Sequence, residues 1–140
     1  MKNKICALVV SCMLLTLSLA GCTPASPTIL GEWRLETVSA MDGTLTAVGK
    51  AYSGTGTADT VDVRLTFDKS GRFTLTGIGE GLSGGYYTDE KSSTDQVQAI
   101  RMNFSDSSET LAACGVRRYQ EDQEQTLTFT YGGSLYVFLR

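Results

Sequence analysis

The cysteines are the residues of this chain best suited to covalent chemistry, since the sequence contains four of them and no histidine. Cys22 directly follows the small residues Ala20 and Gly21 at the end of an apolar run, and its thiol is a candidate for covalent modification. Cys114 could act as a nucleophile or a redox thiol, but no histidine is available to activate it. We therefore expect covalent modification at Cys22 and a buried, unreactive thiol at Cys114.

The residues before Cys22 are arranged like a leader for export. Lys2 and Lys4 precede an apolar run over residues 5–19. This run is shorter than the roughly 20 residues that a transmembrane helix needs, and it fits the apolar part of a signal peptide. Its end, Leu19-Ala20-Gly21-Cys22, resembles a bacterial lipobox. The resemblance implies that the Cys22 thiol receives diacylglycerol before the chain is cut in front of it, so we expect lipidation at Cys22. The alternative is an ordinary secretory leader with a chance cysteine.

The leader divides the chain into three parts. We expect a lipoprotein signal peptide over 1–21, the lipidated cysteine with a short tether over 22–28, and one domain over 29–140. Two or more acyl chains anchor a protein stably, whereas one gives only marginal binding. The sequence therefore predicts a protein held by lipid on the extracytoplasmic face of a cell membrane or envelope.

Acidic residues gather at two places that could hold a cation. The run Glu121-Asp122-Gln123-Glu124 offers oxygen ligands for Ca²⁺, but it lacks the ordered spacing and the central glycine of an EF-hand loop. Asp89 and Glu90, with Asp95 nearby, have no better arrangement. We interpret both places as solvated turns and predict no metal site.

Other polar residues do not have the spacing that catalysis requires. Glu32 and Glu36 lie four positions apart on an expected strand, which separates them by about 13 Å and is too far for a glycosidase pair. Glu80 lies among glycines without an evident partner. The sequence also has no G-x-S-x-G, phosphate-loop or zinc-binding pattern. We therefore expect a protein that is not an enzyme and that uses no cofactor.

The charge of the chain argues against two classes of partner. Without Lys2 and Lys4, the exported part has 10 basic and 15 acidic residues, a net charge of −5. Nucleic-acid binding needs a basic patch or stripe, and electrostatic docking on anionic lipid needs basic residues too. We expect no nucleic-acid partner and predict that membrane contact depends on the lipid at Cys22.

Alternating apolar residues place the side chains of the domain on strands. Residues 61–76 alternate on both sides of Asp68-Lys69-Ser70-Gly71. With Lys69–Gly71 as a three-residue loop, Phe67 lies opposite Phe73 and the glycine takes the left-handed conformation that this loop needs. A four-residue loop would instead put polar residues on the apolar face. We therefore predict a hairpin in the first register.

A second hairpin is predicted over residues 126–139. Gly132-Gly133 forms a two-residue turn that needs positive φ twice, and it pairs Phe129 with Tyr136. The last strand is then apolar on both faces. Either something covers its outer face, or the strand lies at the closing seam of a barrel.

Weaker patterns complete the expected fold. Strands are expected at Leu30–Val38, Gly85–Thr88, Gln96–Phe104 and Val116–Gln120, and around Thr44–Tyr52. One helical turn is expected between residues 103 and 115, where Asp106 and Glu109 have capping-box spacing before Gly115. Seven or eight short strands with glycine-rich turns predict an all-β fold. We expect a small antiparallel up-and-down β-barrel with at most one short helical turn.

The start of the domain resembles a family of small barrels. Gly31-Glu32-Trp33 matches the Gly-x-Trp signature of lipocalins, and Leu65–Phe73 followed by Gly84–Tyr87 is similar to small bacterial lipocalin-like lipoproteins. The resemblance implies that Trp33 plugs the barrel floor and that Arg140 packs across it, with Arg117 and Arg118 as rival candidates. A META-type envelope domain is a second resemblance, carried by Gly77–Gly84, where Glu80-Gly81 replaces that family's Cys-Asn.

Two functions stay open at this point. The first is a membrane-anchored envelope lipoprotein whose barrel binds a small apolar ligand or a protein partner. The second is a non-catalytic structural or stress-related envelope lipoprotein with a filled barrel and no ligand. The interior of the barrel distinguishes them, since five or six large side chains would nearly fill so small a barrel. The six tyrosines suit either a core or a partly wet pocket.

Overall fold

The computed structural model describes residues 28–119 and 122–140, and these residues form an all-β structure. In these two ranges no helix has the length and apolar character needed to cross a membrane. The strands are β1 (Gly31–Ala40), β2 (Leu45–Gly49), β3 (Asp59–Val61), β4 (Arg64–Phe67), β5 (Arg72–Thr76), β6 (Leu82–Thr88), β7 (Val97–Phe104), β8 (Glu109–Tyr119), β9 (Asp122–Tyr131) and β10 (Ser134–Leu139).

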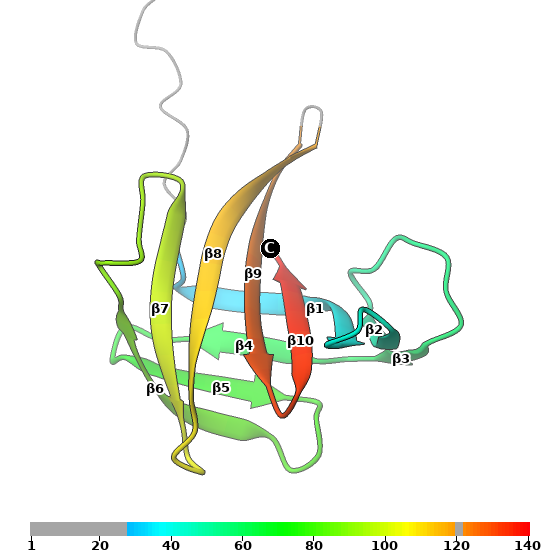
Figure 1. The fold of residues 1–140 in the computed structure, drawn as a ribbon, viewed down its shortest axis with the longest axis horizontal. Helices are drawn as coiled ribbons and strands as arrows, with labels where there is room; N and C mark the ends of the chain where they lie inside the picture. The colour runs from blue at the N-terminus through cyan, green and yellow to red at the C-terminus, as the bar shows by residue number, and fades with distance from the viewer. Residues whose placement is uncertain (1–27, 120–121) are drawn as a thin grey trace, which may run out of the picture.

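Eight of the strands close into an antiparallel barrel (Figure 1). β1 is followed around the barrel by β4 to β10 in sequence order, and β10 returns to pair with β1 over Arg34–Ala40. The predicted all-β barrel is confirmed. The last strand lies at the closing seam, which was one of the two explanations for its apolar faces.

The remaining two strands leave the barrel at a fork in one edge of β1. β1 pairs with β4 over Gly31–Arg34 and then with β2 over Thr37–Ser39, while β10 occupies the opposite edge. A bulge between Leu35 and Thr37 marks the division. β3 adds to β2 in parallel, so β2 and β3 branch away beside the barrel (Figure 1). The strand expected around 44–52 is therefore present as β2.

The continuous strand expected over residues 61–67 is wrong, because the chain changes partner within it. Val61 pairs with Gly49 of β2, whereas Arg64 already pairs with Arg34 of β1. Between the two, the Val63 carbonyl accepts a hydrogen bond of 3.1 Å from the Leu35 amide. Asp62 and Val63 thus form the corner at which the chain passes from the excursion to the barrel.

Both predicted hairpins are confirmed in register. Phe67 lies opposite Phe73, and Gly71 has a φ of +79°. Phe129 lies opposite Tyr136, and the glycines of the following turn have φ values of +57° and +76°. The Asp68 carboxylate accepts hydrogen bonds from the Ser70 and Arg72 amides in the turn of the first hairpin.

The helical turn expected between residues 103 and 115 is wrong. β7 and β8 are joined by a tight turn in which the Asp106 carboxylate accepts a 2.9 Å hydrogen bond from the Ser108 amide. β8 begins at Glu109 and pairs on both sides, so Gly115 lies within a strand. The strand expected at Val116–Gln120 begins seven residues earlier than predicted, and Gln120 lies outside the described residues.

Large side chains from β4, β5, β7, β9 and β10 form one buried cluster in the interior of the barrel. The rings of Phe67 and Phe73 have centroids 6.0 Å apart, those of Phe73 and Phe104 5.0 Å, and those of Phe104 and Phe129 6.3 Å. Phe129 then stacks on Phe138 at 5.8 Å.

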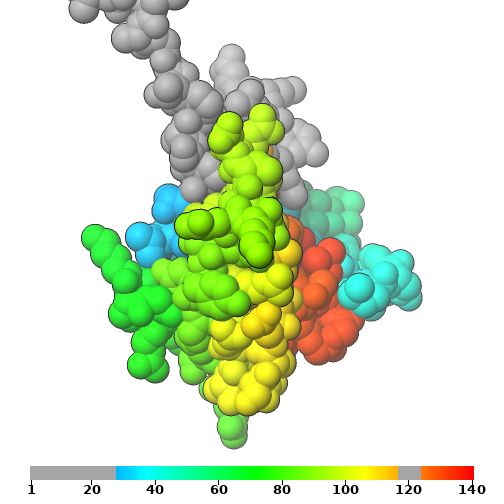
Figure 2. Space-filling model, turned by 60° about the vertical axis from the view of Figure 1, so that its left-hand side comes forward, coloured from blue at the N-terminus to red at the C-terminus, as the bar shows by residue number. Residues whose placement is uncertain are grey.

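Figure 2 shows the outside of one part of this barrel, where the green to yellow strands β6, β7 and β8 form a continuous wall.

Candidate functional site

Trp33 lies at the end of the barrel where the chain enters β1. Its side chain is fully buried, and its indole N–H donates a 2.8 Å hydrogen bond to the Ile29 carbonyl. Ile29 is buried as well, and its amide donates to the Gln98 side chain at 3.1 Å. The residues before β1 therefore turn across this end of the barrel, which we call the closed end.

The structure brings Arg140 onto Trp33. The guanidinium carbon lies 4.4 Å from the centroid of the indole ring, within the range of a cation–π contact. The same guanidinium donates to the Thr28 carbonyl at 2.7 Å and to the Leu30 carbonyl. Arg140 thus fastens the segment before β1 over the buried ring. The side chains of Arg117 and Arg118, the rival candidates, lie outside the described part of the structure.

Cys22, the predicted lipidation site, lies outside the described residues, as do the signal peptide and all of the tether except Thr28. Thr28 is exposed at the closed end, where its carbonyl accepts the hydrogen bond from Arg140. The chain therefore enters the barrel from the closed end.

Cys114 is fully buried in the core, inside β8. Burial raises the pKa of its thiol from the ordinary value of 9.0 to about 11, although the positive charge of Arg140 acts in the opposite direction. The nucleophile of a cysteine is its thiolate, so a raised pKa and burial both suppress reactivity. This environment agrees with a structural thiol.

We expect Cys114 to be inert in the folded protein. A rise in pKa from 9.0 to about 11 lowers the thiolate fraction near pH 8 by about 100-fold before any effect of burial. Because the folded-state pKa is raised, the stability that the neutral thiol contributes is complete below about pH 9 and is lost as the pH rises through about 11.

The test is the labelling rate with a thiol-reactive disulfide reagent at pH 8, in native buffer and in urea. Labelling should be slow in the native state and fast in urea, with a Cys114→Ser variant giving the background. Equal rates in the two conditions would show that the thiol is accessible and the interpretation wrong.

The acidic residues are not brought together as a metal site. Among the residues that the structure describes, no group of three or more acidic or cysteine side chains could hold an ion. Asp89 is not merely solvated, because its carboxylate pairs with Arg101 at 3.0 Å, and this contact lowers its pKa. Glu32 pairs on the outer wall with Arg64 at 3.6 Å. The solvated turn expected at Glu121–Glu124 is wrong in its position, since β9 begins at Asp122.

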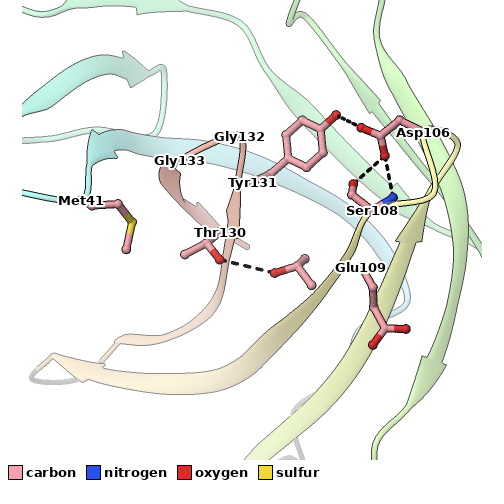
Figure 3. A pocket seen from close by; sticks show the side chains of 9 residues that line it. Met41, Asp106, Ser108, Glu109, Thr130, Tyr131, Gly132 and Gly133 are labelled. Atoms are coloured by element: carbon pink, nitrogen blue, oxygen red, sulfur yellow. Dashed lines mark hydrogen bonds between the residues drawn. The ribbon is translucent and has the colours of Figure 1, made fainter.

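One depression lies at the end of the barrel opposite the closed end. It has a volume of about 510 Å³ and is lined by hairpin residues (Figure 3): Met41, Asp106, Ser108, Glu109, Thr110, Thr130, Tyr131, Gly132 and Gly133.

The polar groups of this depression are already paired with one another. Asp106 accepts hydrogen bonds from the Tyr131 hydroxyl at 2.7 Å and from the Ser108 hydroxyl at 2.5 Å (Figure 3). Its bonds to Ser108, followed by that to Tyr131, hold the pKa of the Asp106 carboxyl below its usual range. Glu109 pairs with Arg101 at 3.0 Å. These groups join two hairpins, so we interpret the depression as a structural junction.

A smaller and more apolar crevice lies in the fork of β1. It has a volume of about 230 Å³ and is lined by Val38, Ala47, Val61, Val63, Gly77, Ile78 and Tyr136. Tyr136 is only 9% exposed, and burial raises the pKa of its phenol. No described residue forms a hydrogen bond with its hydroxyl.

The crevice could not be found from the sequence. Its lining residues come from segments between positions 38 and 136, and only the fork of β1 brings them together. The one signal available was Tyr136 itself, a tyrosine at an inward position among aliphatic and phenyl side chains.

Comparisons with known proteins add no further assignment. No protein-family model, no curated protein and no solved structure matches this chain.

Proposed function

We propose that this chain is a lipid-anchored lipoprotein of the cell envelope, in which a filled, non-catalytic barrel works through its surface. The packed interior carries the proposal. Phe67, Phe73, Phe104 and Phe129 meet in series around the inside of the barrel, and they belong to one buried core cluster, so the interior is occupied by the protein's own side chains. The hollows described above lie at the fork and between the hairpin tips, away from this centre.

The leader-like sequence before Cys22 supports the anchoring part of this proposal. Residues 22–27 can span roughly 20 Å at about 3.3 Å per residue. They lead to Thr28, which Arg140 holds at the closed end. In this arrangement the closed end faces the membrane, and the fork and hairpin tips face away from it.

We also propose that the domain is related to the lipocalin-like lipoproteins that its sequence resembles. The contact between Trp33 and Arg140 supports this proposal, because the resemblance implies an arginine packed across the tryptophan. The antiparallel barrel that begins with Gly31 and Trp33 is compatible with it. The excursion through β2 and β3 adds a feature outside a simple up-and-down barrel.

Acylation is tested by feeding labelled fatty acid to cells that express the full chain. Label should enter the wild-type protein and be lost completely in Cys22→Ala, because the thiol that forms the thioether is gone. Cys114→Ala is the matched control and should keep its label, since this thiol is buried. Equal labelling of wild type and Cys22→Ala would exclude the proposed anchor.

The filled barrel is tested separately by native mass spectrometry of the processed protein extracted from membranes. We expect the mass of the polypeptide with its acyl groups and no retained lipid-sized molecule. A stoichiometric bound lipid that survives gentle extraction would favour an interior ligand and contradict the filled barrel.

A further inference from the structure

We propose that the crevice in the fork of β1 is a binding site for a small, largely apolar molecule that carries one hydrogen-bond acceptor, such as a ketone or ester oxygen. This site lies beside the filled interior and does not depend on the lipid anchor.

The crevice exists because β1 changes partner along one edge. Its walls come from β1 and β2 on one side and from the corner before β4 and the segment after β5 on the other. Gly77 fixes the second wall: its φ is +90°, and a Cβ there would lie 2.1 Å from the Asp62 carbonyl oxygen. The backbones on that side therefore touch, and the opening stays lined by the aliphatic side chains.

Tyr136 provides the polar group of the crevice. Its ring is fixed by stacking on Phe129, with centroids 5.3 Å apart and an angle of 11° between the planes. A phenylalanine could make the same stacking contact, so the hydroxyl is not needed for packing. The hydroxyl has no acceptor among the described residues, and a ligand oxygen would supply one.

The hydroxyl of Tyr136 is reachable. In the described ranges, no fully enclosed side-chain oxygen or nitrogen lacks a hydrogen-bond partner. The Tyr136 hydroxyl has none, so it must keep an opening to solvent, and Tyr136 is one of the residues that line the crevice. In the proposed site this opening is the crevice, and a ligand there accepts the hydrogen bond of Tyr136.

The volume of the crevice limits the size of the ligand. A dry protein cavity of about 150 Å³ holds benzene, and this crevice measures about 230 Å³. One substituted ring or a short branched chain fits, whereas a long acyl chain does not. The apolar lining and the single donor together select a small hydrocarbon body with one acceptor oxygen.

The test uses two probes of nearly the same shape, acetophenone and α-methylstyrene, which differ by a carbonyl oxygen in place of a methylene group. The full-length processed protein is held in lipid nanodiscs with ¹³C-labelled valine and isoleucine methyl groups. We expect both probes to shift the methyl signals of Val61, Val63 and Ile78. Acetophenone should bind about 3- to 10-fold more tightly, the usual range for one hydrogen bond.

Tyr136→Phe is the decisive variant because it removes only the hydroxyl. It should keep α-methylstyrene binding and reduce the preference for acetophenone to about 1-fold. Ala47→Leu should weaken both probes at least 10-fold by filling the crevice, and Leu111→Ala, at an exposed site on the outer wall, should change neither. The proposal would be overturned if the methyl signals did not shift at millimolar concentrations of either probe. It would also be overturned if Tyr136→Phe kept the wild-type preference for acetophenone over α-methylstyrene.

Discussion

Replacing Trp33 by alanine is expected to lower the free energy of unfolding by about 3–5 kcal/mol, the usual cost of deleting a large buried aromatic side chain. The indole is fully buried, donates to the Ile29 carbonyl and carries the Arg140 guanidinium on its face. Removing the indole leaves a cavity at the closed end. The Ile29 carbonyl loses its hydrogen-bond donor, and the Arg140 guanidinium loses the ring on which it lies. Urea unfolding followed by far-UV circular dichroism measures the loss, since Trp33 is the sole tryptophan.

A double-mutant cycle tests whether Trp33 closes the barrel together with Arg140 or stabilises the core independently of it. If Trp33 and Arg140 act together, Trp33→Ala and Arg140→Ala should be less than additive by about 0.5–1 kcal/mol, the range of an exposed cation–π contact. Trp33→Phe keeps most of the buried ring and should cost less than half as much as Trp33→Ala. Additive effects within about 0.3 kcal/mol would mean that the two residues contribute independently.

Gly84→Ala is expected to destabilise the barrel by about 3 kcal/mol, at the upper end for an overpacked site. A Cβ at Gly84 would lie 1.9 Å from the Asn103 carbonyl oxygen of β7 and 3.0 Å from the Phe73 ring. Because a backbone carbonyl in a paired strand cannot move aside alone, β6 and β7 must separate locally. The midpoint of urea unfolding, followed by Trp33 fluorescence, measures the effect.

The neighbouring glycine provides a matched control. A Cβ at Gly85 would meet nothing closer than the Gly71 carbonyl oxygen at 3.7 Å, an ordinary contact. Gly85→Ala should therefore change the free energy of unfolding by less than about 1 kcal/mol, since alanine also restricts the unfolded chain. Similar losses in the two variants would show that β6 and β7 do not approach each other as closely as described.

The parts of the fold that were predicted depend on local signals. The register of each hairpin follows from the turn sequence and from the alternation of apolar and polar residues on both sides of the turn. Each of these signals lies within a few residues of the chain. The two apolar faces of β10 were recognised for the same reason, because the pattern lies within one strand, but the choice between a cover and a closing seam needed the pairing with β1.

The parts that were missed depend on contacts between distant residues. Glu109–Gly115 has the small residues and capping spacing of a helical turn, but Ala112 lies opposite Ile100 and Cys114 opposite Leu127 in two ladders. Pairing on both sides outweighs the local preference of such a segment. The fork is a choice between two partners for one edge of β1, and the sequence near β1 carries no sign of it.

The candidate functional residues also divide into some that were predicted from the sequence and some that were missed. Trp33 and Arg140 were paired through a family resemblance, and the structure shows their contact but also the carbonyls of Thr28 and Leu30 that Arg140 binds. The crevice around Tyr136 was missed because it depends on the fork. A hydroxyl that lies at an apolar crevice without a protein acceptor can be recognised only when its surroundings are known.

The fork also bears on fibril formation. A closed barrel leaves no strand edge on which another chain can add, but the strand order of the described sheet ends at β3, whose second edge pairs with none of the described strands. β3 is three residues long and starts with an exposed aspartate, and Asp62 follows it directly. A short, charged edge is a poor template for cross-β growth. The excursion that opens the crevice should therefore leave the folded protein resistant to fibril formation at high local concentration.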